Sequence, residues 1–263
     1  MIEFQNVTKR FGRKTVLDGV NFRIERGETF IVVGRSGAGK SVSLRHMIHL
    51  LEPDAGRVLV DGQDVNAATG ENLDALLRRF GVLFQSAALI QWLNVEDNVC
   101  LPLRQTPAGR GLTDAEIRRR ANEMLALVGL RDAGAKTPDS ISGGMKKRVG
   151  LARAIVTHPE IVLYDEPTAG LDPVISRQID LLIDRLRRTL GITSVVVTHD
   201  LYSALRIGSR IAMLHEGRII ECSPPAQFLA SPLPIVQDFL RAQGIHSMDV
   251  VDRAFEHIRE DMP

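Results

Sequence analysis

Residues 29–41 read TFIVVGRSGAGKS, an apolar run followed by a glycine-rich turn. The segment 34–41 matches the phosphate-binding pattern G-x-x-x-x-G-K-[ST] at each of its defined positions. The apolar residues before it predict a buried strand, and the residues after it, SVSLRHMIHLL, predict a helix. Glycines let backbone N–H groups approach an anion closely, and a helix N-terminus favours negative charge. The stretch therefore predicts a site for a nucleoside triphosphate on an α/β fold.

Two residues of this segment have a chemistry of their own. Lys40 can place its charge against the β- and γ-phosphates, and the hydroxyl of Ser41 suits Mg²⁺. A glycine-rich turn that matches by chance is the alternative, and the strand before it and the helix after it argue against that alternative. The predicted nucleotide-binding residues here are Gly34, Ser36, Gly37, Ala38, Gly39, Lys40, Ser41 and Val42.

Two further apolar runs, IVLYDEP (161–167) and SVVVTHD (194–200), predict strands that are buried on both faces, as in a parallel sheet. Residues 173–190 between them carry a helical apolar stripe, which makes a βαβ crossover and a doubly wound α/β core. Residues 1–27 and 57–65 alternate polar and apolar positions and predict an antiparallel sheet, with a turn at Asp61-Gly62.

Residues 86–157 lack a strong signal for a buried strand. The sequence TDAE at 113–116 is a capping box that opens a predicted helix, and RQTPAGRG at 104–111 predicts a flexible, exposed loop. We interpret 86–157 as a helical insertion into the α/β core. The apolar face expected on the helix after the capping box comprises Ile117, Ala121, Met124, Leu125 and Val128.

The ends of the predicted strands carry the candidate catalytic groups. Asp165 would hold Mg²⁺, and Glu166 directly after it would orient or deprotonate the attacking water. A helix-capping pair is the alternative for these two residues. A kinase would not need the adjacent glutamate, so hydrolysis is favoured over transfer to a small molecule. A lone histidine after a strand is more often structural, but His199 emerges at the same sheet edge as Asp165, which favours a contact with the γ-phosphate. Gln85 could serve the site or only cap a turn.

Composition bounds the class of protein. The 263 residues include 33 Lys and Arg against 32 Asp and Glu, so the formal net charge of +1 gives no reason to expect nucleic acid as a partner. Cys100 and Cys222 are the only cysteines and lack metal-ligand spacing, which indicates a reducing compartment. We expect no signal peptide at the N-terminus and no membrane-spanning segment.

Six motifs in order, GRSGAGKS, LFQS, ISGGM, IVLYDE, AGLD and VTHD, make residues 1–243 resemble the nucleotide-binding subunits of ATP-binding cassette (ABC) transporters. The resemblance implies the ABC ATPase fold: a P-loop NTPase (RecA-like) parallel core with an antiparallel β subdomain and an inserted helical subdomain. Core and β subdomain would comprise 1–85 and 158–243, with the insertion at 86–157 and a helical tail at 244–263.

In the family, two cassettes dimerise head to tail, and the signature of one chain caps the ATP held by the other. The resemblance thus implies that Ser142, Gly143 and Gly144 contact the γ-phosphate of a partner copy. Phe11 would stack on adenine, where tyrosine is more usual. Gln85 would sense Mg²⁺ and the attacking water, and Asp172 would communicate between the two sites. Met145 stands where most of the family has glutamine.

Three short features, LFQSAAL (83–89), KSV (40–42) and SGGM, resemble the lipid-asymmetry (Mla-type) cassettes. Those work with a permease and mammalian-cell-entry (MCE) lipid-binding proteins and move phospholipids between bacterial membranes. A place on the cytoplasmic face of the inner membrane is implied. An amino-acid importer cassette, a non-transport ABC ATPase and a binding-only cassette are the alternatives. An apolar stripe at Val251, Ala254, Phe255 and Ile258 predicts that the tail packs on its own chain or on the dimer mate.

Overall fold

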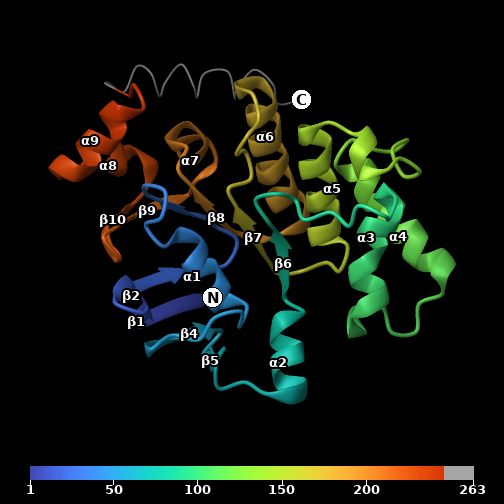
Figure 1. Ribbon diagram of the computed structural model, residues 1–263, viewed down its shortest axis with the longest axis horizontal. Helices are drawn as coiled ribbons and strands as arrows, with labels where there is room; N and C mark the ends of the chain where they lie inside the picture. Colours follow the sequence, from blue (N-terminus) through green and yellow to red (C-terminus); the bar gives the residue numbers. More distant parts are fainter. Residues whose placement is uncertain (246–263) are drawn as a thin grey trace. The chain divides into compact units, whose positions relative to one another are not determined.

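The computed structural model describes residues 1–245, which divide into two compact units (Figure 1). The first unit contains Met1–Asn66 and the chain from Val197 onward, and the second is Ala67–Val196. The boundary at Val196 and Val197 falls inside strand β8 (Thr193–Thr198). The predicted tail helix, with its stripe from Val251 to Ile258, lies outside the described residues.

The first unit contains the predicted antiparallel sheet. Its strand order is β2-β1-β4-β5, and every printed pairing in it is antiparallel. Asp61 and Gly62 both have positive φ, 46° and 81°, and form the turn between β4 and β5, which confirms the predicted hairpin. The half-buried ring of Phe22 in this sheet stacks on two buried rings, Phe4 of the same sheet and Phe30 of β3, with centroids 4.2 and 5.2 Å away. The strands are β1 (Ile2–Phe11), β2 (Lys14–Ile24), β4 (Ala55–Val60) and β5 (Gln63–Asp64).

A second set of strands in this unit has the order β10-β9-β3. β3 (Thr29–Val33) is fully buried and pairs in parallel with β9 (Arg210–His215), as its near-continuous apolar run predicts. The glycine-rich loop connects β3 directly to α1 (Lys40–Met47). The remaining elements are β10 (Arg218–Ser223), α7 (Leu201–Ile207), α8 (Pro225–Leu229) and α9 (Pro234–Ala242).

The second unit holds the strands β6 (Phe80–Leu83) and β7 (Ile161–Asp165), which pair in parallel with Phe80 opposite Ile161. The strand order is β8-β7-β6. Between β7 and β8 the chain forms α6 (Pro173–Leu190), the predicted crossover helix. Its cap is Asp172, and a glycine with φ 67° ends it.

The chain between β6 and β7 contains helices and no strand, as predicted. The capping box at Thr113 and Glu116 is present, and the five residues expected on the apolar face of α4 are all buried. The elements of this unit that precede β7 are α2 (Gly70–Leu77), α3 (Val95–Gln105), the 3₁₀ turn Pro107–Gly109, α4 (Asp114–Leu127), the 3₁₀ turn Pro138–Ser140 and α5 (Gly143–Ile155).

The predicted loop at 104–111 contains more regular structure than its composition indicates. Most of it is exposed, as predicted, but α3 continues to Gln105 and Pro107–Gly109 form a 3₁₀ turn. The Thr106 hydroxyl accepts from the N–H of Ala108, and its own O–H donates to the Pro102 carbonyl at 2.8 Å. These bonds within the segment order a stretch whose Gly and Pro content predicts irregular chain. Across residues 1–245, no helix combines the length and apolar character needed to cross a bilayer.

Candidate functional site

The glycine-rich loop of the first unit has the backbone that its sequence requires. Gly39 has φ 107°, and a Cβ there would lie 3.0 Å from the side chain and the carbonyl of Val16. A Cβ on Gly34 would lie 2.4 Å from the Leu214 carbonyl oxygen. A larger residue at 34 would therefore clash with backbone, and one at 39 would be strained by its positive φ and fit tightly.

The Lys40 ammonium bridges the two ends of this loop. Its Nζ donates to the carbonyl of Gly34 at 2.9 Å and to that of Arg35 at 3.3 Å, and the side chain is buried. The charge is thereby held at the mouth of the loop, where a β- or γ-phosphate would lie. Ser41, in the first turn of α1, and Val42 after it are half-buried. The other predicted contacts, Ser36, Gly37 and Ala38, lie in the loop itself.

Phe11 and His199 belong to the same unit. Phe11 ends β1 with its side chain 47% exposed, and the Lys9 ammonium lies 5.7 Å from the centre of its ring. An exposed ring of this kind can offer a face to a nucleobase. His199 is an exposed residue directly after β8. Its predicted contact with a phosphate stays a prediction.

A residue that sequence reasoning missed holds the backbone around His199. Gln243, at the C-cap of α9, donates from Nε2 to the His199 carbonyl at 2.7 Å. Its Oε1 accepts from the Leu201 N–H at 2.9 Å. Asp200 adds an N-cap to α7 through the N–H groups of Tyr202 and Ser203. The loop that carries His199 is therefore tied at both sides, and no sequence pattern near residue 243 indicates this.

The catalytic pair predicted in the second unit lies at the end of β7. Asp165 is half-buried, and Glu166 is 9% exposed with a φ of 47°. A glutamate in the left-handed region is strained, and strain of this kind concentrates at functional sites. The Glu166 carbonyl accepts from the Ala169 N–H at 3.2 Å and from the Lys147 ammonium at 3.0 Å. Glu166 is thus held by α5 as well as by its own turn.

Gln85 follows β6 and is exposed. Its carbonyl accepts from the Lys147 ammonium at 2.6 Å, so one lysine touches the backbone of Gln85 and of Glu166. The structure therefore brings these two predicted residues to the same side chain. Ala87 and Ala88, with φ values of 59° and 44°, continue the loop in the left-handed region.

The signature residues open α5. Ser142 is the N-cap, and its Oγ accepts from the Met145 N–H at 3.3 Å. Only the backbone of Met145 takes part in this bond, so the unusual side chain at 145 is compatible with the cap. Ser142 and Gly143 are exposed, and no acidic residue occupies the first turn, which leaves the helix N-terminus suited to an anion. Gly144 has to be small, because a Cβ there would lie 2.7 Å from Ile175.

Asp172 is the N-cap of α6. One carboxylate oxygen accepts from the N–H groups of Val174 and Ile175, both at 3.0 Å. The residue therefore has a structural role in addition to the predicted communication between sites.

The predicted metal ligands come from both units: Ser41 from the first, Gln85 and Asp165 from the second. Hydroxyl, amide and carboxylate oxygens are hard donors that suit Mg²⁺. In the described part of the chain, no group of three or more His, Cys, Asp or Glu side chains could hold a metal ion.

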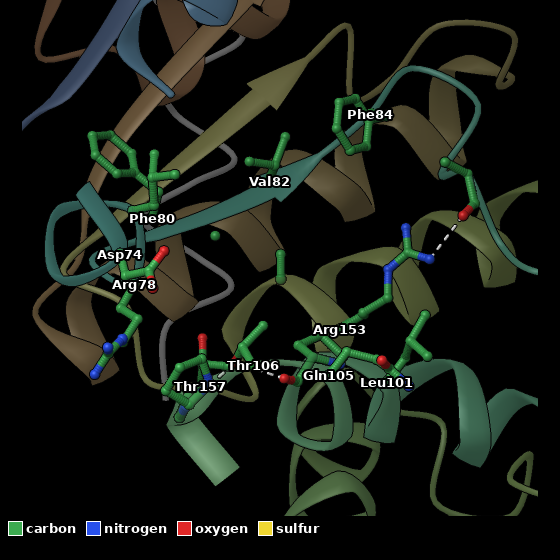
Figure 2. A pocket seen from close by; sticks show the side chains of 17 residues that line it. Asp74, Arg78, Phe80, Val82, Phe84, Leu101, Gln105, Thr106, Arg153 and Thr157 are labelled. Atoms are coloured by element: carbon green, nitrogen blue, oxygen red, sulfur yellow. Dashed lines mark hydrogen bonds between the residues drawn. The ribbon is translucent and has the colours of Figure 1, made fainter. Parts of the chain in front are cut away.

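A groove lies within the second unit and has a volume of about 760 Å³ (Figure 2). Figure 2 shows Phe80, Val82 and Phe84, from β6 and the residue after it, on one side and Leu101, Gln105 and Thr106 on the other. Arg153 extends toward the groove from α5. Sequence reasoning missed this groove, because part of its wall is the segment expected to be a flexible loop.

Comparison with known proteins identifies the family. The family model described as "ABC transporter" matches residues 17–169. The chain is an ATP-binding cassette of the ABC transporter family. It is 39% identical over 232 residues to the methionine import ATP-binding protein MetN of Rhizobium johnstonii, covering 88% of this chain and 63% of that protein.

The probable ribonucleotide transport ATP-binding protein mkl of Mycobacterium tuberculosis is 38% identical over 244 residues, which are 93% of this chain and 67% of that protein. The chain thus spans about two thirds of the length of these relatives.

Solved structures of cassettes share the fold. The dimeric structure of MJ0796, a bacterial ABC transporter cassette, has a TM-score of 0.78 at 35% identity and covers 86% of this chain and 99% of its own. The cbiO1 structure from Clostridium perfringens, part of the ABC transporter complex cbiONQ, has a TM-score of 0.79 at 26% identity and covers 98% of both chains. The predicted ABC ATPase fold is thereby confirmed. Cassettes of this family bind ATP and are ATPases.

Proposed function

We propose that this chain hydrolyses ATP to drive an ABC transporter, with Glu166 as the residue that orients or deprotonates the attacking water. The observation that carries the proposal is the strained backbone of Glu166, at φ 47°, stabilised by a buried ammonium. Such a conformation costs about 1–3 kcal/mol, and costs of this kind concentrate at functional sites.

The other residues of the cassette have roles that follow from their positions. Lys40 and the loop N–H groups would bind the phosphates, and His199 would donate to the γ-phosphate. Mg²⁺, when bound through Ser41, Gln85 and Asp165, would offset the charge that develops on the phosphates. Phe11 would face the adenine. Steady-state kinetics of a variant at each of these residues distinguishes a role in binding from a role in turnover. Loss of a binding contact raises KM, and loss of a transition-state contact lowers kcat.

The test is the Glu166→Gln variant, which keeps the size of the side chain and removes its basicity. ATP should still bind and hold two chains together, while hydrolysis falls by about 100-fold or more, as expected for loss of a general base. Glu123→Gln, at an exposed position of α4, is the matched control and should hydrolyse ATP at the normal rate. Undiminished turnover in Glu166→Gln would refute the assignment.

We further propose that two copies pair head to tail, so that Ser142, Gly143 and Gly144 of one copy contact the nucleotide of the other. The exposed N-terminus of α5, free of acidic residues in its first turn, supports this. A mixture of two inactive chains, Glu166→Gln and Ser142→Arg, tests it. In a head-to-tail pair, one of the two sites in each mixed dimer is intact, so activity should return on mixing. If both halves of a site came from one chain, mixing would restore nothing.

The groove of the second unit is the surface that we propose for a cytoplasmic segment of the membrane permease. Its wall is apolar at Phe80, Val82, Phe84 and Leu101, and α5 forms part of it through Arg153. Phe84→Arg should abolish co-purification with the permease and leave the ATPase rate of the isolated cassette unchanged. Leu50→Arg, at an exposed apolar residue of the first unit, is the control and should assemble normally.

For the cargo, we propose phospholipid, with an MCE-type lipid-binding protein as a further partner at the inner membrane. The support is the likeness of LFQSAAL, KSV and SGGM to lipid-asymmetry cassettes. An amino-acid importer is the second candidate, and its support is the 39% identity to a methionine import protein. Two measurements on the co-purified permease complex decide between them. Bound phospholipid, identified by mass spectrometry, supports the first candidate, and stimulation of the ATPase rate by methionine supports the second.

A further inference from the structure

Two cationic side chains of helix α5, Lys147 and Arg153, contact the loops that follow β6 and β7. Lys147 is 5% exposed, and its ammonium donates to the carbonyls of Gln85 at 2.6 Å and Glu166 at 3.0 Å. Arg153 donates to the carbonyls of Ala88 at 2.8 Å and Ala87 at 2.5 Å. Figure 2 shows Arg153 directed at this loop. All of these residues belong to the second unit.

A lysine has a long, flexible stem and can normally place its charge in water. Lys147 instead buries it, and this desolvation lowers the pKa of its ammonium, while the nearby Asp165 and Glu166 act to raise that pKa. A buried charge is stable only when donors and acceptors are well matched. The carbonyls of Gln85 and Glu166 provide that match, so the position of each depends on the other through one side chain.

The backbone that these two cations hold is strained. Glu166, Ala87 and Ala88 all have positive φ, between 44° and 59°, in a region that residues with a Cβ rarely adopt. Charged donors on the carbonyls of all three residues stabilise this conformation. Because these bonds connect α5 to Glu166 and to the loop of Gln85, a movement of α5 would displace both.

We infer that Lys147 is a positioning residue that aligns Glu166 and the Gln85 loop with the signature helix. The inference rests on the proposed catalytic role of Glu166. The N-cap of α5 is Ser142, which is five residues before Lys147 and belongs to the proposed contact with the partner's nucleotide. When the partner's nucleotide fixes the position of the α5 N-terminus, Lys147 transmits that position to Glu166 of the same chain through its bond to the Glu166 carbonyl. Each copy then aligns its own base in response to the nucleotide of its mate.

The test replaces Lys147 with methionine, which keeps the length of the side chain and removes its donors. We expect kcat to fall about 10-fold to 100-fold, as for a misplaced catalytic group, with KM for ATP changed less than about threefold. Lys146→Met is the matched control: it removes the same charge from the neighbouring, half-buried position of α5 and should keep the normal kcat. Lys147→Gln, which retains a donor, should recover part of the lost rate and covers the case in which Lys147→Met fails to fold.

A second arm separates this inference from the proposed function. In the Glu166→Gln background, Lys147→Met should cause no further loss of turnover, because the base that it positions is already absent. If Glu166→Gln itself hydrolyses ATP normally, the proposed function fails and the inference with it. If Glu166→Gln is inactive but Lys147→Met keeps its kcat, or loses kcat only in proportion to the folded fraction measured by circular dichroism, Lys147 is a packing residue and the inference alone is wrong.

Discussion

The cap on α6 gives a prediction whose size can be worked from the contacts. Pro173 occupies the first position of the helix and has no N–H to satisfy. The next two N–H groups, of Val174 and Ile175, both donate to one oxygen of Asp172. In Asp172→Ala, the N–H groups of Val174 and Ile175 lose this partner and can donate only to water. Loss of an N-cap costs about 0.5–2 kcal/mol, and loss of an exposed negative charge at a helix N-terminus adds about 0.3–1 kcal/mol.

We therefore expect Asp172→Ala to lower the free energy of unfolding by about 1–3 kcal/mol. Asp172→Asn keeps an acceptor oxygen and loses only the charge, so it should lose about 0.3–1 kcal/mol, and less at high salt. Urea unfolding, followed by far-UV circular dichroism at low and high salt, measures both losses. Equal losses in the two variants would refute the view that the carboxylate acts as a cap.

The same pair of variants tests the predicted communication between sites. Asp172→Asn preserves the fold of α6, so a fall in its ATPase rate would assign the charge a role beyond capping. A normal rate in Asp172→Asn together with a reduced rate in Asp172→Ala would show that the residue serves the site only through the helix that it caps.

Three further outcomes follow from buried or strained positions. Gly39→Ala should abolish ATP binding in equilibrium dialysis, because its Cβ would meet neighbouring atoms at 3.0 Å; Gly37→Ala, with open space around its Cβ, should retain binding at reduced affinity. In the folded protein only the exposed thiol of Cys222 should react with Ellman's reagent, and after unfolding both thiols should react. Cys100 is protected in the folded protein because it is buried and burial raises the pKa of its thiol to about 11. Burial lowers the pKa of His46 in the folded protein, so as the pH falls the unfolded chain binds a proton at this residue before the folded chain does. The free energy of unfolding should therefore decrease as the pH drops below about 6.5. A His46→Gln variant should show a smaller loss of its thermal midpoint between about pH 7.5 and 5.5.

The sequence predicted the parts of the fold that depend on local pattern. Near-continuous apolar runs predicted β3, β7 and β8, and the capping box at Thr113 predicted the start of α4. The helical end and the 3₁₀ turn within 104–111 were not predicted, because a hydroxyl that bonds backbone groups stabilises them and composition does not reveal this.

The candidate site divides in the same way. The glycine-rich loop and the acidic pair have signatures that lie within a few consecutive residues. Lys147 has none, since Lys146-Lys147-Arg148 resembles a solvated basic run. One signal was available: Lys147 shares a helical face with Leu151 and Ile155, both buried, and a lysine in an apolar stripe indicates a buried charge. Gln243 offered no signal, because its two bonds join residues more than forty positions apart in the chain.

The amide of Gln243 makes the end of α9 part of the environment of His199. If the last turn of α9 unwinds, the His199 carbonyl and the Leu201 N–H lose their shared partner at the same time. With His199 in its proposed role at the γ-phosphate, an affinity tag, a fluorescent fusion or a truncation at this point of the chain would alter turnover without touching the nucleotide. Kinetic work on this cassette should therefore carry such labels elsewhere.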